Sequence, residues 1–243
     1  MLTRSEDAMG LSFWDCHKGK NSDGHVIERD DGFVDVDTLR SYFQEYEDWS
    51  SEEKSAMRLC RGRVLDVGCG VGKHSIHLQG KGLDVLGIDN SPLALKVCRE
   101  RGLKRTKCMS ADEVEGKLGK FDTVIMMGNN FGLFENPEKA REMLATFHRA
   151  TSPGARIIAQ TMDPYATEKK GHLEYQARNR RLGRMPGQIR LRIRYDRLAT
   201  PWFDYLIVSR EEMKEILRGT GWKVSRFIGK GALYIAVIVK TGR

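Results

Sequence analysis

Short runs of apolar and β-branched residues alternate with stretches of helical periodicity through the middle of the chain. The strand-like runs cover residues 63–67, 83–89, 105–111, 121–127 and 155–161, and the helical stretches cover residues 73–79, 92–101 and 137–150. Pro92 and Pro137 stand at first helical positions, each behind a residue type that caps helices well. This alternation predicts a doubly wound α/β sheet.

The C-terminal part predicts a helix followed by an antiparallel pair of strands. Ser209 and Glu212 have the spacing of a capping box, and Gly219 ends the helix. Strand-like runs follow at residues 222–228 and 233–240. The connection between them is too short for a parallel crossover, which needs about a dozen residues, so we expect a hairpin.

The N-terminal part is less regular. Residues 1–35 contain few apolar positions and predict an irregular, partly mobile arm. Apolar and aromatic residues at three-to-four spacing from Asp37 predict a helix, and Ser50 with Glu53 caps a second one. We expect residues 1–60 to form a lid of arm and helices, and residues 61–243 to form the main domain. Within the lid, the side chains of Tyr42, Tyr46 and Trp49 are candidates to line the cofactor pocket. Aromatic residues at this spacing more often belong to the hydrophobic core.

A long insertion of about 45 residues separates the fifth strand-like run from the last capped helix. Within it, residues 189–195 alternate strictly, so that one face of a strand is apolar and the other carries Arg190, Arg192 and Arg194. We expect this strand to pair with another extended segment. The insertion, at about residues 163–205, then forms a β-rich lid on the substrate side.

Charge is concentrated in this insertion. The chain carries a net charge of +8, and residues 165–205 hold ten basic and four acidic residues, which is +6 of that total. The arginine face has three possible roles: a solvated face that protects a sheet edge, a clamp for an anionic small substrate, or a nucleic-acid surface. Few aromatic residues lie nearby for base stacking, so nucleic acid is possible but not favoured.

The amino-acid composition limits which classes of protein this chain can belong to. A chain of 243 residues with 40% hydrophobic residues is large enough for the core of one α/β domain. No apolar run is long enough to span a membrane, and no secretory signal is visible, so we expect a cytoplasmic location without membrane contact. The five cysteines include no C-x-x-C pair, and His74 and His77 lack ligand partners at matching spacing. No metal is expected.

A glycine-rich turn follows the first strand-like run. Gly68, Gly70 and Gly72 let the backbone approach a ligand closely, and the next helix directs free N–H groups toward it. Seventeen residues after Gly72, Asp89 ends the second run, where its carboxylate can accept hydrogen bonds from both hydroxyls of a ribose. Together these features predict a nucleoside-containing cofactor.

Two details separate this turn from a dinucleotide site. The position where the dinucleotide fingerprint requires its third glycine is Lys73. Asp66, two residues before the first glycine, has no role with a dinucleotide, but it suits a cofactor that carries a positive amino group. A nicotinamide oxidoreductase remains an alternative on the glycines alone.

Residues 64–72, Val-Leu-Asp-Val-Gly-Cys-Gly-Val-Gly, resemble the first motif of class I S-adenosylmethionine-dependent methyltransferases, and residues 86–91 resemble the second. The motifs do not identify the subfamily. The resemblance implies a seven-stranded Rossmann-like sheet of order 3-2-1-4-5-7-6 with strand 7 antiparallel. It implies S-adenosylmethionine as cofactor, with Asp112 at the adenine amino group and Gly128 and Asn129 beside the methionine part. The full set of expected cofactor residues is Asp66, Gly68, Cys69, Gly70, Gly72, His74, Asp89, Asn90, Ser91, Ala111, Asp112, Gly128 and Asn129.

A sulfonium methyl group is already activated, so in-line transfer needs mainly a nucleophile held on axis and away from water. The candidate catalytic residues follow strands four and five: Asn129, Asn130, Asp163 and Tyr165, with His172 less secure. Residues 163–165, Asp-Pro-Tyr, resemble the Asp/Asn-Pro-Pro-Tyr signature of methyltransferases that act on nucleic-acid bases. They have one proline and follow strand five, which disfavours base methylation.

We therefore expect S-adenosylmethionine-dependent methyl transfer to a small-molecule acceptor, possibly anionic. An RNA methyltransferase that uses the arginine-rich insertion is the first alternative. A factor that binds S-adenosylmethionine without transferring methyl is the second.

Overall fold

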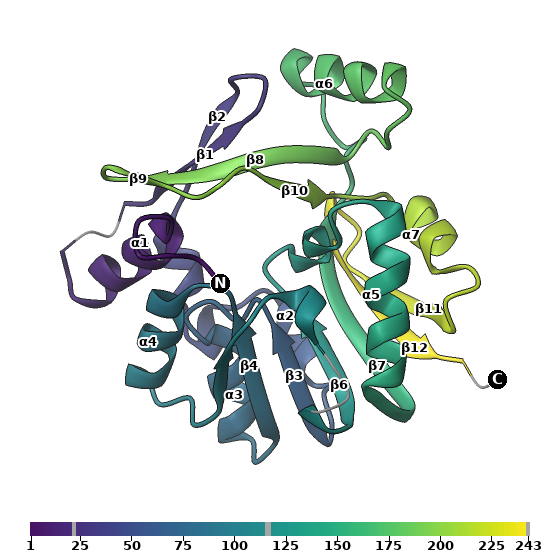
Figure 1. The fold of residues 1–243 in the computed structure, drawn as a ribbon. Helices are drawn as coiled ribbons and strands as arrows, with labels where there is room; N and C mark the ends of the chain where they lie inside the picture. Colours follow the sequence, from purple (N-terminus) through teal and green to yellow (C-terminus); the bar gives the residue numbers. More distant parts are fainter. Residues whose placement is uncertain (21–22, 115–117, 242–243) are drawn as a thin grey trace.

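The computed structural model describes residues 1–20, 23–114 and 118–241, which form a large and a small β-sheet with flanking helices (Figure 1). The α-helices are α1 (Ala8–His17), α2 (Ser51–Met57), α3 (Lys73–Gly80), α4 (Pro92–Glu100), α5 (Pro137–Arg149), α6 (Lys170–Arg181) and α7 (Arg210–Leu217). The strands are β1 (His25–Arg29), β2 (Val34–Asp37), β3 (Arg63–Val67), β4 (Asp84–Asp89), β5 (Thr106–Cys108), β6 (Phe121–Met126), β7 (Thr151–Met162), β8 (Gln188–Tyr195), β9 (Leu198–Ala199), β10 (Phe203–Leu206), β11 (Trp222–Ile228) and β12 (Leu233–Lys240). Short 3-10 helices are η1 (Leu39–Tyr42), η2 (Tyr46–Asp48), η3 (Ala111–Glu113) and η5 (Asn130–Phe134).

The large sheet has the order β11-β12-β7-β6-β3-β4-β5. Strands β3 to β7 pair in parallel, whereas β12 is antiparallel to both β7 and β11. In the order of the chain this is 3-2-1-4-5-7-6 with an antiparallel seventh strand. The predicted fold class and the predicted C-terminal hairpin are confirmed.

Helix caps fix where the main-sheet helices begin. The side chains of Ser91 and Asn136 accept backbone N–H bonds at the starts of α4 and α5, each next to a proline at the first turn. The predicted capping boxes at Ser50 and Ser209 are both present. These local signals were readable in the sequence because they depend on residues only three positions apart.

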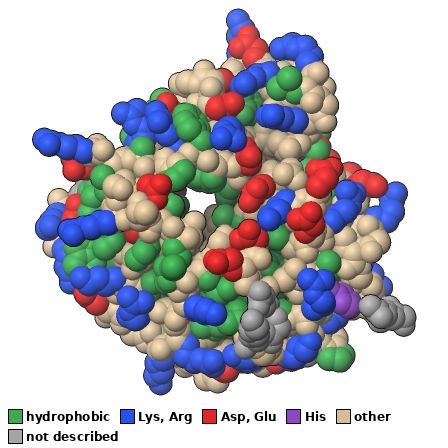
Figure 2. Space-filling model, in the orientation of Figure 1, with side chains coloured by type: hydrophobic (Ala, Val, Ile, Leu, Met, Phe, Trp, Pro, Cys, Tyr) green, Lys and Arg blue, Asp and Glu red, His purple; other side chains and the backbone are tan. Residues whose placement is uncertain are grey.

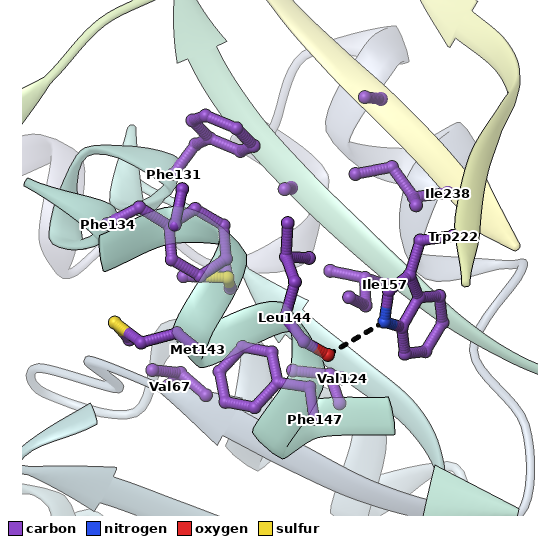
Figure 3. Packing of buried hydrophobic residues seen from close by; sticks show 14 of the residues in the cluster. Val67, Val124, Phe131, Phe134, Met143, Leu144, Phe147, Ile157, Trp222 and Ile238 are labelled. Carbon is purple, nitrogen blue, oxygen red and sulfur yellow. Dashed lines mark hydrogen bonds between the residues drawn. The ribbon is translucent and has the colours of Figure 1, made fainter. Parts of the chain in front are cut away.

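The core lies on both faces of the large sheet. One cluster joins the sheet to α5 and α7, and its side chains interdigitate in Figure 3, where the indole N–H of Trp222 donates to the carbonyl of Leu144 over 2.9 Å. The other face packs on α2, where Ala56 and Met57 are buried together with Trp49. This packing holds the carboxyl ends of β3, β4 and β6 at one edge of the molecule.

The small sheet, of order β10-β8-β1-β2 with β9 paired to β8, lies beyond that edge (Figure 1). The predicted strand at residues 189–195 is confirmed as β8. Its partners precede and follow it in the chain, since Ile193 is opposite Ile27 of β1 and Ile189 is opposite Tyr205 of β10.

Several expectations for the lid were wrong. Residues 1–35 are not an irregular arm within the described part, because they contain α1 and β1 and the start of β2. The aromatic spacing after Asp37 does not form an α-helix, since the chain makes the two 3-10 turns η1 and η2. The insertion is not only β-structured, because it also contains α6. Strand β5 is shorter than the predicted run of residues 105–111. Among the described helices, none is long and apolar enough to cross a membrane.

Candidate active site

The glycine-rich turn connects β3 to α3 at the carboxyl edge of the large sheet. Gly68, Gly70 and Gly72 have φ angles of +70°, +53° and +81°, which residues with a Cβ rarely adopt. A Cβ at Gly68 would lie 2.6 Å from Nδ2 of Asn130, so the backbone is tightly enclosed there. At Gly70 the nearest atom would be 3.9 Å away, so this part of the turn is open to a ligand.

Asp89 lies at the end of β4 beside this turn. Its carboxylate accepts the backbone N–H groups of Gly70 and Ser91, both over 2.9 Å. Burial raises the pKa of Asp89 to about 6, although these two hydrogen bonds lower it. The arrangement places an acidic group next to the open glycine.

Asp66 lies beneath the turn rather than on its surface. Its side chain is 2% exposed and accepts a hydrogen bond of 2.7 Å from the hydroxyl of Ser75 in α3. Burial raises the pKa of Asp66, and the nearby His74 opposes this rise. Asp66 therefore lies where a carboxylate supports the start of α3.

The end of β6 forms the opposite wall. The side-chain oxygen of Gln160 in β7 accepts the N–H groups of Gly128 and Asn129 over 2.9 and 3.1 Å. The amide of Asn130 donates to the carbonyls of Val67 and Gly68 over 3.0 and 2.8 Å, which ties this wall to the glycine turn. Sequence reasoning missed Gln160, whose only signal was a polar residue within a buried strand.

Asn129 differs from its neighbour. It adopts a left-handed conformation with φ of +67°, and its side-chain oxygen is buried without a hydrogen-bond partner among the described residues. Gly128 next to it has open space where a Cβ would stand. An unpaired acceptor beside open space suits a ligand that donates hydrogen bonds.

The other expected cofactor residues surround the turn. Ser91 caps α4 and donates to Asp7 over 2.7 Å, and the carbonyl of Asn90 accepts from Leu2. Cys69 is buried in the turn, and His74 contacts Glu53 over 3.2 Å. Ala111 and Asp112 lie in η3 after β5, where Asp112 contacts Lys139 over 3.3 Å.

The residues expected after strand five contact other partners. A carboxylate oxygen of Asp163 accepts the N–H of Tyr165 over 2.9 Å, as in a tight turn. The hydroxyl of Tyr165 donates to Glu212 in α7 over 2.6 Å, and the residue is 46% exposed. His172 packs on Phe33, with ring centres 4.9 Å apart. These side chains are therefore directed to the turn, α7 and the lid.

The small sheet covers the carboxyl edge of the large one. Tyr205 of β10 donates its hydroxyl to the backbone carbonyl of Asn129 over 2.6 Å. A Cβ at Gly132 would lie 2.1 Å from the Tyr205 ring, so the glycine makes room for it. Figure 2 shows an opening through the molecule between the two sheets, with acidic side chains along one side. Sequence reasoning missed Tyr205, because the contact joins positions 76 residues apart.

Comparison with known proteins places this edge in a known family. A family model described as a methyltransferase domain matches residues 64–154, which include the glycine turn, Asp89 and the end of β6. Residues 64–154 thus match a methyltransferase domain, and the whole chain has the fold of S-adenosylmethionine-dependent methyltransferases. Its fold is similar to that of an S-adenosylmethionine-dependent methyltransferase from Bacteroides fragilis in complex with S-adenosylhomocysteine, with a TM-score of 0.84, 23% identity and coverage of 100% and 98% of the two chains.

Curated relatives of this methyltransferase include glycine/sarcosine N-methyltransferases. The protein from Halorhodospira halochloris is 31% identical over 172 residues, which are 65% of this chain and 61% of the relative. The protein from Parasynechococcus marenigrum is 32% identical over 39% of this chain and 36% of the relative. The matched regions therefore span less than two thirds of these relatives.

The residues of this methyltransferase fit the family's cofactor, S-adenosylmethionine. Gly70 is open beside the carboxylate of Asp89, which suits a ribose. The unpaired oxygen of Asn129 beside open space at Gly128 suits the amino group of the methionine part.

The arginines of β8 lie on the outer face of the methyltransferase's small sheet. Arg192 makes a two-pronged contact with Glu28 at 3.0 and 3.1 Å, and Arg190 contacts Asp204 at 3.3 Å. Strand register puts the arginines on the same face as Val34 and Val36, which are 53% and 59% exposed. These contacts favour the solvated-face interpretation of the arginines.

The histidines of α3 have packing partners. His77 stacks on Tyr46, with ring centres 4.2 Å apart, and Trp49 packs on both histidines. Burial of Glu53 would raise its pKa, but hydrogen bonds from His74 and Lys73 outweigh this and hold the pKa at about 2. Within the described part of the chain, no cluster of three or more histidine, cysteine or acidic side chains is arranged to hold a metal ion.

Proposed function

We propose that this methyltransferase transfers the methyl group of S-adenosylmethionine to an amine nitrogen of a small-molecule acceptor. The observation that carries the proposal is the cover formed by the small sheet, which is hydrogen-bonded to the end of β6 through Tyr205. The end of β6 at Asn129 thus lies between the large sheet and the small sheet, which suits a small acceptor better than a folded RNA.

The roles of the chain's own residues follow from their places. Gly68 and Gly70 let the cofactor approach the backbone, and Asp89 accepts hydrogen bonds from the ribose hydroxyls. Asn130 holds the two walls at a fixed separation through its bonds to Val67 and Gly68. The cofactor, when bound, supplies an activated sulfonium methyl group. The small sheet excludes water and keeps the acceptor on the axis of transfer.

The names of related proteins support an amine acceptor. Glycine/sarcosine N-methyltransferases are among the curated relatives. A similar fold, with a TM-score of 0.52 and 16% identity, occurs in a 1,6-didemethyltoxoflavin-N1-methyltransferase from Burkholderia thailandensis. In both cases the name of the protein specifies methylation at nitrogen.

The test is transfer of labelled methyl from S-adenosylmethionine to a panel of glycine, sarcosine, amino sugars and total RNA. We expect label in at least one small amine and none in RNA, and we expect Asp89→Ala to abolish it at limiting cofactor. Label in RNA that disappears with rising salt would favour an RNA methyltransferase. Cofactor binding without transfer to any cell fraction would indicate a non-catalytic binding factor.

A further inference from the structure

The inner face of the small sheet carries a polar cluster of Asp37, His25, Tyr42 and Tyr205, which the sequence motifs do not include. Asp37 ends β2 and is paired in register with His25 of β1. Tyr205 of β10 is opposite Ile189, and alternation places it on the same face, away from the arginines of β8. This face is the one that contacts Asn129.

Contacts within the cluster leave one carboxylate oxygen of Asp37 available. The hydroxyl of Tyr42 donates to Oδ2 of Asp37 over 2.5 Å, and Nε2 of His25 lies 3.7 Å from the same oxygen. No described residue donates a hydrogen bond to Oδ1. The Asp37 side chain is 31% exposed, so a ligand can reach it.

The surroundings hold Asp37 in place. His25 is 2% exposed, its Nδ1 is bonded to Ser12 over 3.0 Å, and its Nε2 has no hydrogen-bond partner among the described residues. Phe13 packs against Tyr42 with ring centres 4.8 Å apart. A carboxylate held by a half-buried tyrosine and a buried histidine has little freedom to move, which is a property of built ligand sites.

Packing contacts place this carboxylate on the open side of the glycine turn. The atom nearest to where a Cβ of Gly70 would stand is Cε2 of Phe13, 3.9 Å away, and the Phe13 ring packs on Tyr42, whose hydroxyl donates to Asp37. Burial raises the pKa of Tyr42 and of Tyr205, and the charge of Asp37 raises both further. These shifts agree with that placement, and Tyr205 on the same face of the small sheet contacts the Asn129 carbonyl directly. Acidic side chains along the opening in Figure 2 add to the negative potential there.

We propose that Asp37 is the residue that binds the amine of the acceptor, with its free carboxylate oxygen accepting an N–H of that amine beside Asn129. This inference rests on the proposed function and narrows the acceptor to a primary or secondary amine. Tyr42 acts as a positioning residue, because it fixes the Asp37 carboxylate.

The chemistry balances with the groups named. The lone pair of the neutral amine forms the new N–C bond while the C–S bond breaks and its electron pair goes to sulfur. The methylated ammonium keeps its protons, and the carboxylate of Asp37 stabilises the positive charge until the product leaves.

The test compares Asp37→Asn, which keeps the shape and removes the charge, with Asp35→Asn. Asp35 is on the same strand and face, is exposed, and accepts only the adjacent N–H of Val36 over 2.9 Å. For an amine substrate we expect Asp37→Asn to raise KM at least tenfold, Tyr42→Phe to raise it less, and Asp35→Asn to leave it within twofold. Calorimetry should give unchanged S-adenosylmethionine affinity for all three.

A binding measurement keeps the outcome independent of turnover. Propylammonium and propionate are titrated into the S-adenosylhomocysteine complex of wild-type, Asp37→Asn and Asp35→Asn proteins. We expect propylammonium binding to weaken at least tenfold only in Asp37→Asn, and propionate to bind no better to wild type than to that variant. Equal propylammonium binding by wild type and Asp37→Asn, including none by either, overturns the inference. Failure of the proposed function is distinct, since wild type would then transfer no methyl to any amine.

Discussion

The proposed cofactor side and the proposed acceptor side of this protein are built in different ways. The cofactor side consists of short motifs at the ends of neighbouring parallel strands, with Gly68 to Gly72 after β3 and Asp89 at the end of β4. The acceptor side is a small antiparallel sheet that pairs residues 25–37 with residues 188–206. Local motifs therefore specify the first, whereas long-range pairing specifies the second. The two sides should respond separately to mutation.

The largest effect on cofactor affinity is expected from Gly68→Ala, which changes the glycine turn. The added Cβ meets Asn130 Nδ2 at 2.6 Å, and φ of +70° strains any residue but glycine. In the free variant the turn should relax out of its cofactor-binding conformation. Restoring that conformation on binding costs about 1 to 2 kcal/mol of strain and about 1 kcal/mol for one lost Asn130 bond, which predicts a weakening of S-adenosylmethionine binding by about a hundredfold. Calorimetry measures this change.

Gly82→Ala is the matched control for backbone strain. Gly82 has φ of +85°, and a Cβ there meets nothing within 4 Å. It should lower stability while leaving cofactor affinity unchanged. Equal cofactor affinity in both variants would show that the glycine turn does not bind the cofactor closely.

The second prediction concerns pH. The pKa of Asp89 is raised to about 6, so the carboxyl group of the free protein gains a proton as pH falls through 6. A neutral carboxyl group accepts hydrogen bonds from ribose hydroxyls less well than a carboxylate. S-adenosylmethionine affinity should therefore fall by about tenfold between pH 7 and pH 5, and Asp89→Asn should remove this dependence. Affinity that is flat over this range in the wild type would contradict the role of Asp89.

The third prediction tests the junction between the two sides. Tyr205→Phe removes the hydrogen bond to Asn129 and should lower stability by about 1 kcal/mol and methyl-transfer kcat/KM by severalfold, with cofactor affinity unchanged. Tyr234→Phe is the control, because its hydroxyl donates to the Val208 carbonyl over 2.8 Å within the main core. It should lower stability by a similar amount without changing transfer. Equal kcat/KM in the two variants would argue against a functional junction at Tyr205.

The smallest effect is expected on the outer face of the small sheet. Arg192→Gln breaks the contact with Glu28, and an ion pair at the protein surface contributes at most about 1 kcal/mol to stability. Methyl transfer, measured with the labelled-cofactor assay, should be unchanged. A loss of more than tenfold in transfer would instead support the arginine clamp for an anionic acceptor.

The sequence predicted the large sheet because its signals are local. The β3 run, the glycine turn, the prolines at the starts of α4 and α5, and the short connection before β12 each involve only neighbouring residues. In a parallel sheet, such residues meet at one edge without further information. The predicted strand order followed from the resemblance of the same local motifs to a known family.

The small sheet was harder to predict. Strands β1 and β2 are short, and β1, His-Val-Ile-Glu-Arg, has no clear hydrophobic alternation. Strand β2, Val-Asp-Val-Asp, does alternate, but its valines are exposed and its aspartates lie on the inner face, so the pattern indicates the wrong buried face. Asp31-Gly32 was an available hairpin signal between them. The spacing of the aromatic residues after Asp37 resembles that of an α-helix. The residues instead form two 3-10 turns, whose side chains pack onto α1 and α3.

In the candidate site, too, residues in local motifs were predicted and residues placed by long-range contacts were not. The expected cofactor residues lie around one edge of the large sheet, and their roles remain predictions. Asp37 and Tyr205 had no sequence signal, and Gln160 had only that of a polar residue within a buried strand, because each acquires its place through contacts with residues distant in the chain. Asn130, expected to face the substrate, has its amide bonded to the backbone of the glycine turn.

The most direct test of the separation between the two sides is calorimetric titration of S-adenosylmethionine into wild-type, Asp89→Ala and Asp37→Asn proteins, with methyl transfer to an amine measured on the same samples. The account predicts that Asp89→Ala loses about 1 to 3 kcal/mol of cofactor binding, while Asp37→Asn binds the cofactor like wild type and loses amine methylation. Loss of cofactor binding in Asp37→Asn, or unchanged binding in Asp89→Ala, would contradict it.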